Sequence, residues 1–421
     1  GLAPSDWAAL RFTVFQALVS GVISIAVAIP AARALARRRF PGRQFMVTLL
    51  GAPFILPSIV AVLGILAVWG RSGYISEILV GFGGSRLDIY GFTGVVLAHV
   101  FFNIPLATRL ILQGWVSIPA EHFRLAAQLN MSSHDIHVQL ERPMLRGIVP
   151  GAFLLVFLLC ITSFAVALAL GGGPKATTLE VAIYQALRFD FNLSKAALLA
   201  LIQFGLCASV AAVTIVIATP ADFSIGLDRE PLRWDGREWW NRVFDRIILI
   251  AVAMFLFAPL VSILIKGVPP LFRLPDQVWP AASNSVVVAL ASAVLAILLS
   301  LSLSFLIVRL SPRRRRASQT MEVMGFLTLA ASPFVIGTGL FILINPFADP
   351  FALALPVTAL INAAMSLPFA LRIVLPALVR AERNYGRLAD SIGMSGFGRF
   401  RLAIWPRIQR QVGFAAGLSA A

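Results

Sequence analysis

Residues 124–143 read RLAAQLNMSSHDIHVQLERP, and residues 387–406 read RLADSIGMSGFGRFRLAIWP. The second stretch repeats the first 263 positions later, and the correspondence runs without a gap from position 105 to position 147. Identical pairs include Pro105 with Pro368, Arg109 with Arg372, Arg124, Leu125 and Ala126 with Arg387, Leu388 and Ala389, Met131 and Ser132 with Met394 and Ser395, and Pro143 with Pro406. Such a repeat predicts two similar halves, which we place at residues 1–228 and 229–421.

The composition around this repeat indicates a membrane protein. The chain is 59% hydrophobic and only 13% charged, with a mean hydropathy of +0.87, whereas a soluble domain carries about a quarter charged residues. A helix needs roughly 20 apolar residues to cross a bilayer. Nine stretches qualify, at residues 9–31, 45–69, 92–116, 147–170, 196–219, 247–267, 283–308, 324–345 and 351–379. A tenth begins near Gln411. The expected fold class is an all-α polytopic membrane protein, with helices kinked at the prolines that lie inside these stretches.

The basic residues predict how the chain is oriented. The formal charge is +16, but the Lys and Arg residues form short clusters between apolar runs, so we expect no nucleic-acid partner. Alternate connections carry 25 basic residues, and the opposite connections carry seven. Because cytoplasmic loops hold the excess of Lys and Arg, the richer side is expected to be cytoplasmic. Both repeated stretches lie on that side, after spans that are six apart, so the halves share one topology and a pathway is expected between them.

The two repeated loops, at 117–146 and 380–408, are the candidate functional segments. Each carries apolar residues at helical spacing, Phe123, Ala126, Ala127 and Met131 in the first and Leu388, Ile392 and Met394 in the second. A short amphipathic helix of this kind can dock into a groove of a partner protein. It can also lie on membrane lipid, and from one copy alone the two interpretations carry similar weight. The presence of two matched copies favours a pair of levers for a pair of partners.

Both loops resemble the EAA loops of ABC importer permeases, whose pattern is EAA, three residues, Gly, about nine residues, an apolar residue, Leu and Pro. Ala126 and Ala389 keep the last Ala, Gly393 keeps the Gly, and Pro143 and Pro406 keep the Pro. The sequence departs from the pattern elsewhere. In both copies Arg replaces the Glu of the pattern, and Leu replaces its middle Ala. In the first copy Asn130 replaces the Gly, and Asn can adopt a left-handed conformation. The expected coupling residues are Arg124, Leu125, Ala126, Asn130, Met131, Pro143, Arg387, Leu388, Ala389, Gly393, Met394 and Pro406.

The resemblance implies the rest of the machine. In this family the loops form coupling helices that sit in clefts of two ATPase subunits, which bind ATP and Mg, and a periplasmic binding protein delivers a small solute at the bacterial inner membrane. Permeases of thiamine and thiamine-diphosphate importers, two-half subunits similar to iron(III) permeases, resemble this chain most, above all over TSFAVALALGGGPKATTLEVAIYQAL, Thr162 to Leu187. They have six spans per half, which implies one span before Gly1 and most of two after Ala421.

Sites for chemistry within this chain are few. It has no GxxxxGK[ST] motif, so we expect ATP hydrolysis in separate subunits and no cofactor here. His122, His134 and His137 share the first loop without a Cys or a convergent carboxylate pair, and Cys160 and Cys207 lie inside apolar segments, so no metal site is expected.

Several residues are candidates for the pathway or a gate. Arg109 and Arg372 lie within two turns of the cytoplasm, where a long side chain either snorkels to the headgroups or forms part of a gate. Gly171, Gly172 and Gly173 form either a tight turn or a nest of N–H groups for a phosphate. Pro57, Pro333 and Ser163 complete the set.

Three alternatives remain at this point. The same machine can carry ferric iron or another small solute. An ion-driven secondary carrier is a rival of a different class, although no Asp or Glu lies in the middle of an expected span. A polytopic membrane enzyme is the third, and it lacks a cluster of His, Asp, Glu or Ser at catalytic spacing.

Overall fold

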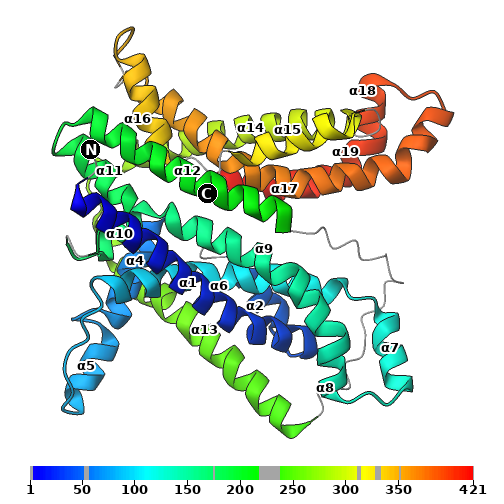
Figure 1. The fold of residues 1–421 in the computed structure, drawn as a ribbon, viewed down its shortest axis with the longest axis horizontal. Coiled ribbons are helices and arrows are strands. Elements are labelled where there is room, and N and C mark those ends of the chain that lie inside the picture. Colours follow the sequence, from blue (N-terminus) through cyan, green and yellow to red (C-terminus); the bar gives the residue numbers. More distant parts are fainter. Residues whose placement is uncertain are drawn as a thin grey trace. The chain divides into compact units, whose positions relative to one another are not determined.

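The computed structural model describes residues 3–51, 56–173, 176–217, 238–310, 314–327, 333–349 and 352–420. Every regular element among them is a helix (Figure 1). Eight helical runs in this part of the chain are long and apolar enough to cross a membrane: Pro4–Arg37, Ser58–Gly81, Phe92–Ser117, Ser133–Ile161, Leu193–Val213, Trp239–Leu271, Val278–Leu310 and Ala354–Ser391. The prediction of an all-α polytopic membrane protein is therefore confirmed.

Some of the predicted spans have different limits in the structure. The span expected at 45–69 is divided in the structure, with α2 at Arg43–Leu49 and α4 at Ser58–Trp69, and α4 begins only after Pro57, its non-helical N-cap. The span expected at 147–170 begins earlier and is interrupted at Thr162, whose hydroxyl bonds back to the Leu158 carbonyl oxygen at 3.2 Å. The span expected at 324–345 includes residues 328–332, which lie outside the described residues, as does the predicted boundary at 228.

The helices group into two compact units. The first comprises residues 1–199 and 212–273, and the second comprises residues 200–211 and 274–421, so α12 contributes to both. Elements of the first unit are α1 (Pro4–Arg37), α2, α4, α5 (Tyr74–Gly81), α6 (Phe92–Ser117), α7 (Ala120–Gln128), α8 (Ser133–Ile136), η1 (His137–Glu141), α9 (Arg142–Ile161), α10 (Phe164–Leu170), α11 (Leu179–Arg188), α13 (Trp239–Gly267) and η4 (Pro269–Arg273); α12 is Leu193–Ile217. Elements of the second are α14 (Val278–Leu310), α15 (Arg315–Leu327), α16 (Pro333–Ile344), α17 (Ala354–Ser391), α18 (Gly396–Arg399), η6 (Phe400–Ile404) and α19 (Trp405–Ala420).

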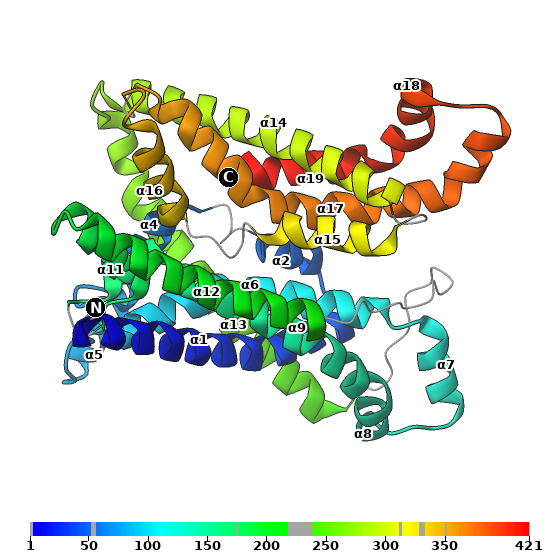
Figure 2. The same ribbon diagram turned by 45° about the horizontal axis from the view of Figure 1, so that its top comes forward.

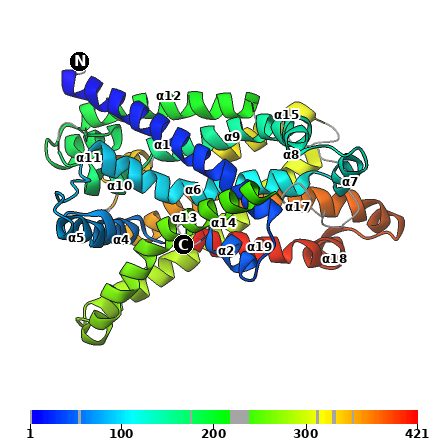
Figure 3. The ribbon, with the colours of Figure 1, turned by 90° about the horizontal axis from the view of Figure 1, so that it is seen from below.

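In the first unit, α1 packs along α6, α9 and α13, and α13 also packs against α4 (Figure 3). Small residues allow the close approach, as is usual between helices in lipid. Gly21 of α1 faces the Phe153 ring, and Gly64 of α4 faces the backbone of α13 at Pro259. The helices α7 and α8 lie at one end of this bundle, and α5, α10 and α11 lie at the other (Figure 1).

In the second unit, α14, α17 and α19 pack side by side (Figure 2). Their shared core is apolar and includes Val374, Leu378, Ile404, Ile408 and Val412, each at most 6% exposed. At one end of the unit, α17 continues beyond this core and turns back through α18 into α19. This end and the α7–α8 end of the first unit carry the two repeated loops.

Candidate functional site

The first repeated loop is a chain of short helical pieces. After α6 ends at Ser117, the extended residue Pro119 precedes α7 at Ala120–Gln128. Ser132 then caps α8, since its hydroxyl accepts the Asp135 N–H at 3.3 Å while the Asp135 carboxylate accepts the Ser132 N–H at 2.9 Å. A π-helical turn, η1, joins α8 to α9.

The second loop repeats this pattern at the same distance of 263 residues. Its counterpart of α7 is continuous with the preceding span in α17, which runs for 38 residues. Beyond that point α18 at Gly396–Arg399, the π-helical turn η6 at Phe400–Ile404 and the start of α19 match α8, η1 and α9 residue for residue. A π-helical turn is rare, so its presence at matched positions is a second line of evidence for the repeat, independent of residue identity.

We call α7 and its counterpart, residues 383–391 at the end of α17, the lever helices, and both end in the same hydrogen-bonded turn. The Met131 N–H donates to the Ala126 carbonyl oxygen at 3.0 Å, and the Met394 N–H donates to the Ala389 carbonyl oxygen at 2.9 Å. The residue before each methionine is left-handed, with φ of 50° at Asn130 and 69° at Gly393. This is a Schellman motif, which needs a left-handed residue at that position. The left-handed conformation expected of Asn130 is confirmed.

The faces of the two lever helices are also alike. Ala126 and Ala389 are each only 2% exposed, so both face the interior. The residues directly before them, Leu125 and Leu388, are 54% and 59% exposed. Of the other predicted coupling residues, Arg124, Asn130, Gly393, Pro143 and Pro406 are exposed and Met131 and Met394 are half-buried. Arg387 lies in α17, and the description does not extend to its side chain.

The outward apolar pair in each loop was only partly found from the sequence. One turn beyond Leu125 lies Leu129, 66% exposed, and one turn beyond Leu388 lies Ile392, 62% exposed. The helical spacing in the first loop included Phe123 among the apolar residues of the docking face, but the side chain of Phe123 is buried in the structure, with only 3% exposed. Superposing the two copies by their 263-residue offset would have singled out Leu129, because only the pair Leu125 and Leu129 matches Leu388 and Ile392.

The candidate pathway residues are spread over both units. Arg109 extends toward Gly51, and Arg372 lies on an exposed face of α17. Pro57 and Ser163 precede the first residues of α4 and α10. Pro333 is the first residue of α16. The structure therefore does not bring these residues together within one unit.

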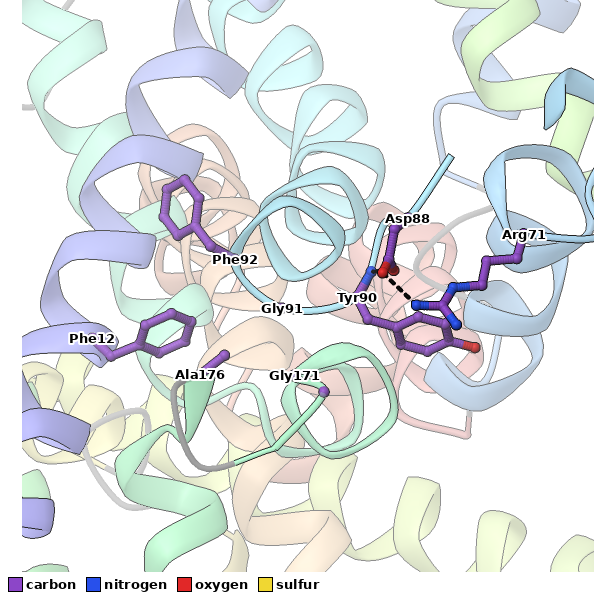
Figure 4. Close-up of a pocket in the computed structure, with 9 residues that line it drawn as sticks. Phe12, Arg71, Asp88, Tyr90, Gly91, Phe92, Gly171 and Ala176 are labelled. Carbon is purple, nitrogen blue, oxygen red and sulfur yellow. Dashed lines mark hydrogen bonds and ion pairs between the residues drawn. The ribbon is translucent and has the colours of Figure 1, made fainter. Parts of the chain in front are cut away.

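The three glycines lie at the end of the first unit opposite the loop. Gly171 ends α10, and Gly172 and Gly173 take positive φ values of 69° and 120°. Figure 4 shows Gly171 at a pocket of about 500 Å³, which Gly172 also lines. On one side of the pocket Arg71 pairs with Asp88 and lies over the Tyr90 ring, and Phe12 and Phe92 lie on the other side. The hydrogen bond from Arg71 holds the pKa of Asp88 below its usual value.

A buried polar cluster inside the first bundle was missed from the sequence. His99 Nδ1 lies 2.7 Å from Gln16 Oε1, and Gln16 Nε2 donates to the Cys160 carbonyl oxygen at 3.1 Å. Asn103 Nδ2 lies 3.3 Å from the Cys160 sulfur. These contacts tie α1, α6 and α9 together. The signal available in the sequence was a His, an Asn and a Gln inside apolar stretches, since polar groups there require partners.

No metal centre emerges from the part of the chain that the structure describes. Within it, no group of three or more His, Cys, Asp or Glu residues is placed to hold an ion. His137 instead pairs with Glu141, at 3.2 Å between Nδ1 and Oε2.

Comparison with known proteins adds a family to this geometry. The chain is 40% identical to the thiamine transport system permease protein ThiP of Brucella abortus (strain 2308) over 414 residues, which cover 97% of this chain and 76% of the relative. It is 37% identical to ThiP of Escherichia coli (strain K12) over 405 residues, 94% of this chain and 75% of the relative. The putative ferric transport system permease protein FbpB 1 of Haemophilus influenzae is 28% identical over 174 residues, 41% of this chain and 27% of the relative. A comparison with protein-family models found no match.

Proposed function

The chain belongs to the ThiP family of thiamine transport permeases, and from this premise we propose that it forms the membrane pathway of an ATP-driven importer of thiamine and its phosphates. The observation that supports this proposal most directly is the pair of matched loops. Each loop ends its lever helix in the same left-handed turn and exposes an apolar pair at matched positions. Two equivalent levers suit two equivalent ATPase subunits.

The geometry of the loops supports a mechanism for this proposal. Two partner ATPases bind ATP and Mg and close. Their clefts bind the exposed apolar pairs, Leu125 with Leu129 and Leu388 with Ile392. Because each lever helix leads through a π-helical turn into α9 or α19, movement of the lever is passed to a long helix of its bundle. The pathway then opens outward to receive the solute from a periplasmic binding protein.

The same proposal assigns an orientation in the inner membrane. The loops lie in the cytoplasm, and the connection between α5 and α6 lies outside. Ser133→Cys and Ser85→Cys test this in intact cells with a membrane-impermeant thiol reagent, because Cys160 and Cys207 are buried and give little background. We expect labelling of the Ser85→Cys variant alone. Labelling of Ser133→Cys from outside would invert the orientation.

The function itself is tested by reconstituting the permease with its candidate ATPase and binding protein in liposomes. Thiamine with its binding protein is expected to stimulate ATP hydrolysis and to accumulate inside. Ferric iron is the second candidate, supported by the shorter similarity to FbpB 1, and stimulation by iron alone would favour it. Uptake that needs an ion gradient and no ATPase would instead identify a secondary carrier.

A further inference from the structure

Within the shared backbone of the two loops, two pairs of matched positions carry opposite chemistry. Position 141 in the first loop is Glu, and its counterpart 404 is Ile. Position 136 is Ile, and its counterpart 399 is Arg. All four side chains are mostly buried or engaged, so this exchange concerns how the loops are held and not how they meet a partner.

In the first loop the ionic group is the carboxylate of Glu141, at the end of the π-helical turn. It is fully buried, and its Oε2 lies 2.8 Å from Arg33 Nη2 of α1. Its Oε1 accepts the indole N–H of Trp115, at the end of α6, at 3.2 Å. A buried carboxylate that lost these partners would be costly, so the three segments are held in one arrangement. Glu141 thus fastens the loop to two long helices of its own bundle.

In the second loop apolar packing replaces this ionic contact. Ile404 is 4% exposed and packs in one cluster with Leu378, which occupies the position that corresponds to Trp115. The ionic group is instead Arg399 of α18. Its Nη1 lies 2.6 Å from Asp390 Oδ1, and its Nη2 pairs with Glu382.

The first-loop counterparts of Arg399, Glu382 and Asp390 cannot form an ion pair. Glu382 and Asp390 correspond to Pro119 and Ala127, neither of which has an acidic side chain. The counterpart of Arg399 is Ile136, which is fully buried. Each loop therefore has one ionic anchor and one apolar anchor, at exchanged places.

We propose that Glu141 and Arg399 are positioning residues: Glu141 makes the first coupling loop move with α1 and α6, and Arg399 makes the returning segment α18 of the second loop move with α17. The inference rests on the proposed function, since it concerns how force from an ATPase reaches the membrane. The exposed apolar pair provides binding, and the anchor converts binding into movement. A loop without its ionic anchor still docks, but less of the movement of its lever reaches α9 in the first unit or, through α18 and η6, α19 in the second.

The two anchors differ in their exposure to solvent. Glu141 is shielded, whereas the side chains of Arg399, Glu382 and Asp390 are 22%, 31% and 65% exposed. Salt screens exposed pairs much more than buried ones. The second loop should therefore be the salt-sensitive one.

The test uses the complete transporter in liposomes and measures solute taken up per ATP hydrolysed, together with ATPase affinity. Glu141→Ala and Arg399→Ala are each expected to lower the uptake ratio at least threefold while ATPase affinity stays within twofold. Arg401→Ala, an exposed arginine of the same loop, is the matched control and should leave both unchanged. Arg399→Lys, which keeps the charge, should recover part of the ratio.

Two grafts separate positioning from folding. Trp115→Leu with Glu141→Ile gives the first loop the apolar pair of the second, and Arg33, whose side chain is 27% exposed, can remain hydrated. Well-packed apolar groups can replace a buried ion pair, so this graft should return the ratio to within twofold of wild type. Arg399→Ile with Asp390→Ala and Glu382→Ala gives the second loop the apolar chemistry of the first. This graft should likewise recover, and it should remove the fall in the ratio seen when salt rises from about 0.1 M to about 1 M.

Several outcomes would overturn the inference. The first is that the alanine variants keep the wild-type ratio of solute taken up to ATP hydrolysed. The second is that they lose ATPase affinity in proportion to uptake. The third is that the grafts behave like the single substitutions. If Glu141→Ala does not fold, the Arg399 variants, whose altered side chain is less buried, provide the test. A wild-type complex that neither binds an ATPase nor transports would refute the proposed function instead, so the two failures are distinguishable.

Discussion

The four exposed apolar side chains of the lever helices offer the sharpest test of the docking surface. We consider replacing Leu125, Leu129, Leu388 and Ile392 by Gln, which removes apolar surface. Gln is a good helix former, so the backbone of each lever should persist. The Schellman turns should persist too, because they depend on backbone N–H groups and on Asn130 and Gly393.

The magnitude follows from the exposed surface. Leu125 and Leu129 are 54% and 66% exposed, so together they offer slightly more apolar area than one fully exposed leucine, and the second loop offers the same. Burying a leucine side chain is worth about 1.5 to 3 kcal/mol. Each loop should therefore lose about 2 to 3 kcal/mol of binding free energy, or roughly 30- to 150-fold in the Kd for its ATPase.

The assay is binding of the purified ATPase to the permease held in a nanodisc, one loop altered at a time. The matched control places Met at the same two positions, which keeps the apolar area and should keep the Kd within about threefold. Equal losses are expected from the two loops, since their exposed fractions agree closely. A Kd within twofold of wild type for the Gln variants of both loops would show that the ATPase grips another surface.

Two further predictions concern glycines. Gly393→Ala forces a left-handed alanine into the second turn, at a cost of about 1 to 2 kcal/mol, and should speed hydrogen exchange of the next amide about five- to thirtyfold. Gly398→Ala, with open space around it and no positive φ, should have no such effect. Gly64→Leu places its Cβ 2.8 Å from the Pro259 carbonyl oxygen, so α4 and α13 must separate and the midpoint of thermal unfolding should fall. Gly205→Leu, where a Cβ meets nothing within 4 Å, is the control, and equal effects from both leucines would contradict the packing argument.

What could be predicted from the sequence is what depends on local spacing. Long apolar runs predict spanning helices, because the bilayer sets their length and composition. The 263-residue offset predicts matched loops, and Asn130 at the Gly393 position predicts a left-handed turn, because few residues tolerate that conformation. These expectations concern neighbours in the chain, so a single sequence is sufficient for them.

Contacts between distant segments could not be predicted in this way. Nothing local to Glu141 indicates Arg33 and Trp115 as its partners, although a carboxylate facing the bundle must have some. The limits of the spans near Pro57 and Thr162 moved for a similar reason. Hydropathy averages over a window, whereas the end of a helix depends on individual backbone hydrogen bonds.

The fusion of two halves in one chain provides a physical reason why the backbone of the loops is shared and their anchors are not. The turn at each lever and the π-helical turn after it are made by hydrogen bonds between near neighbours, so each half can keep them independently. The anchors are side-chain contacts, from Glu141 to α1 and α6 and from Arg399 to α17, and in a homodimer any change to one of them would appear in both loops at once. In a fused chain, Glu141 and Arg399 can take different partners in each half. If both ATPases are copies of one protein, they act on levers that look alike outward and are held differently inward. The two anchors should then differ in their response to salt, and only the Arg399 anchor should weaken as salt rises.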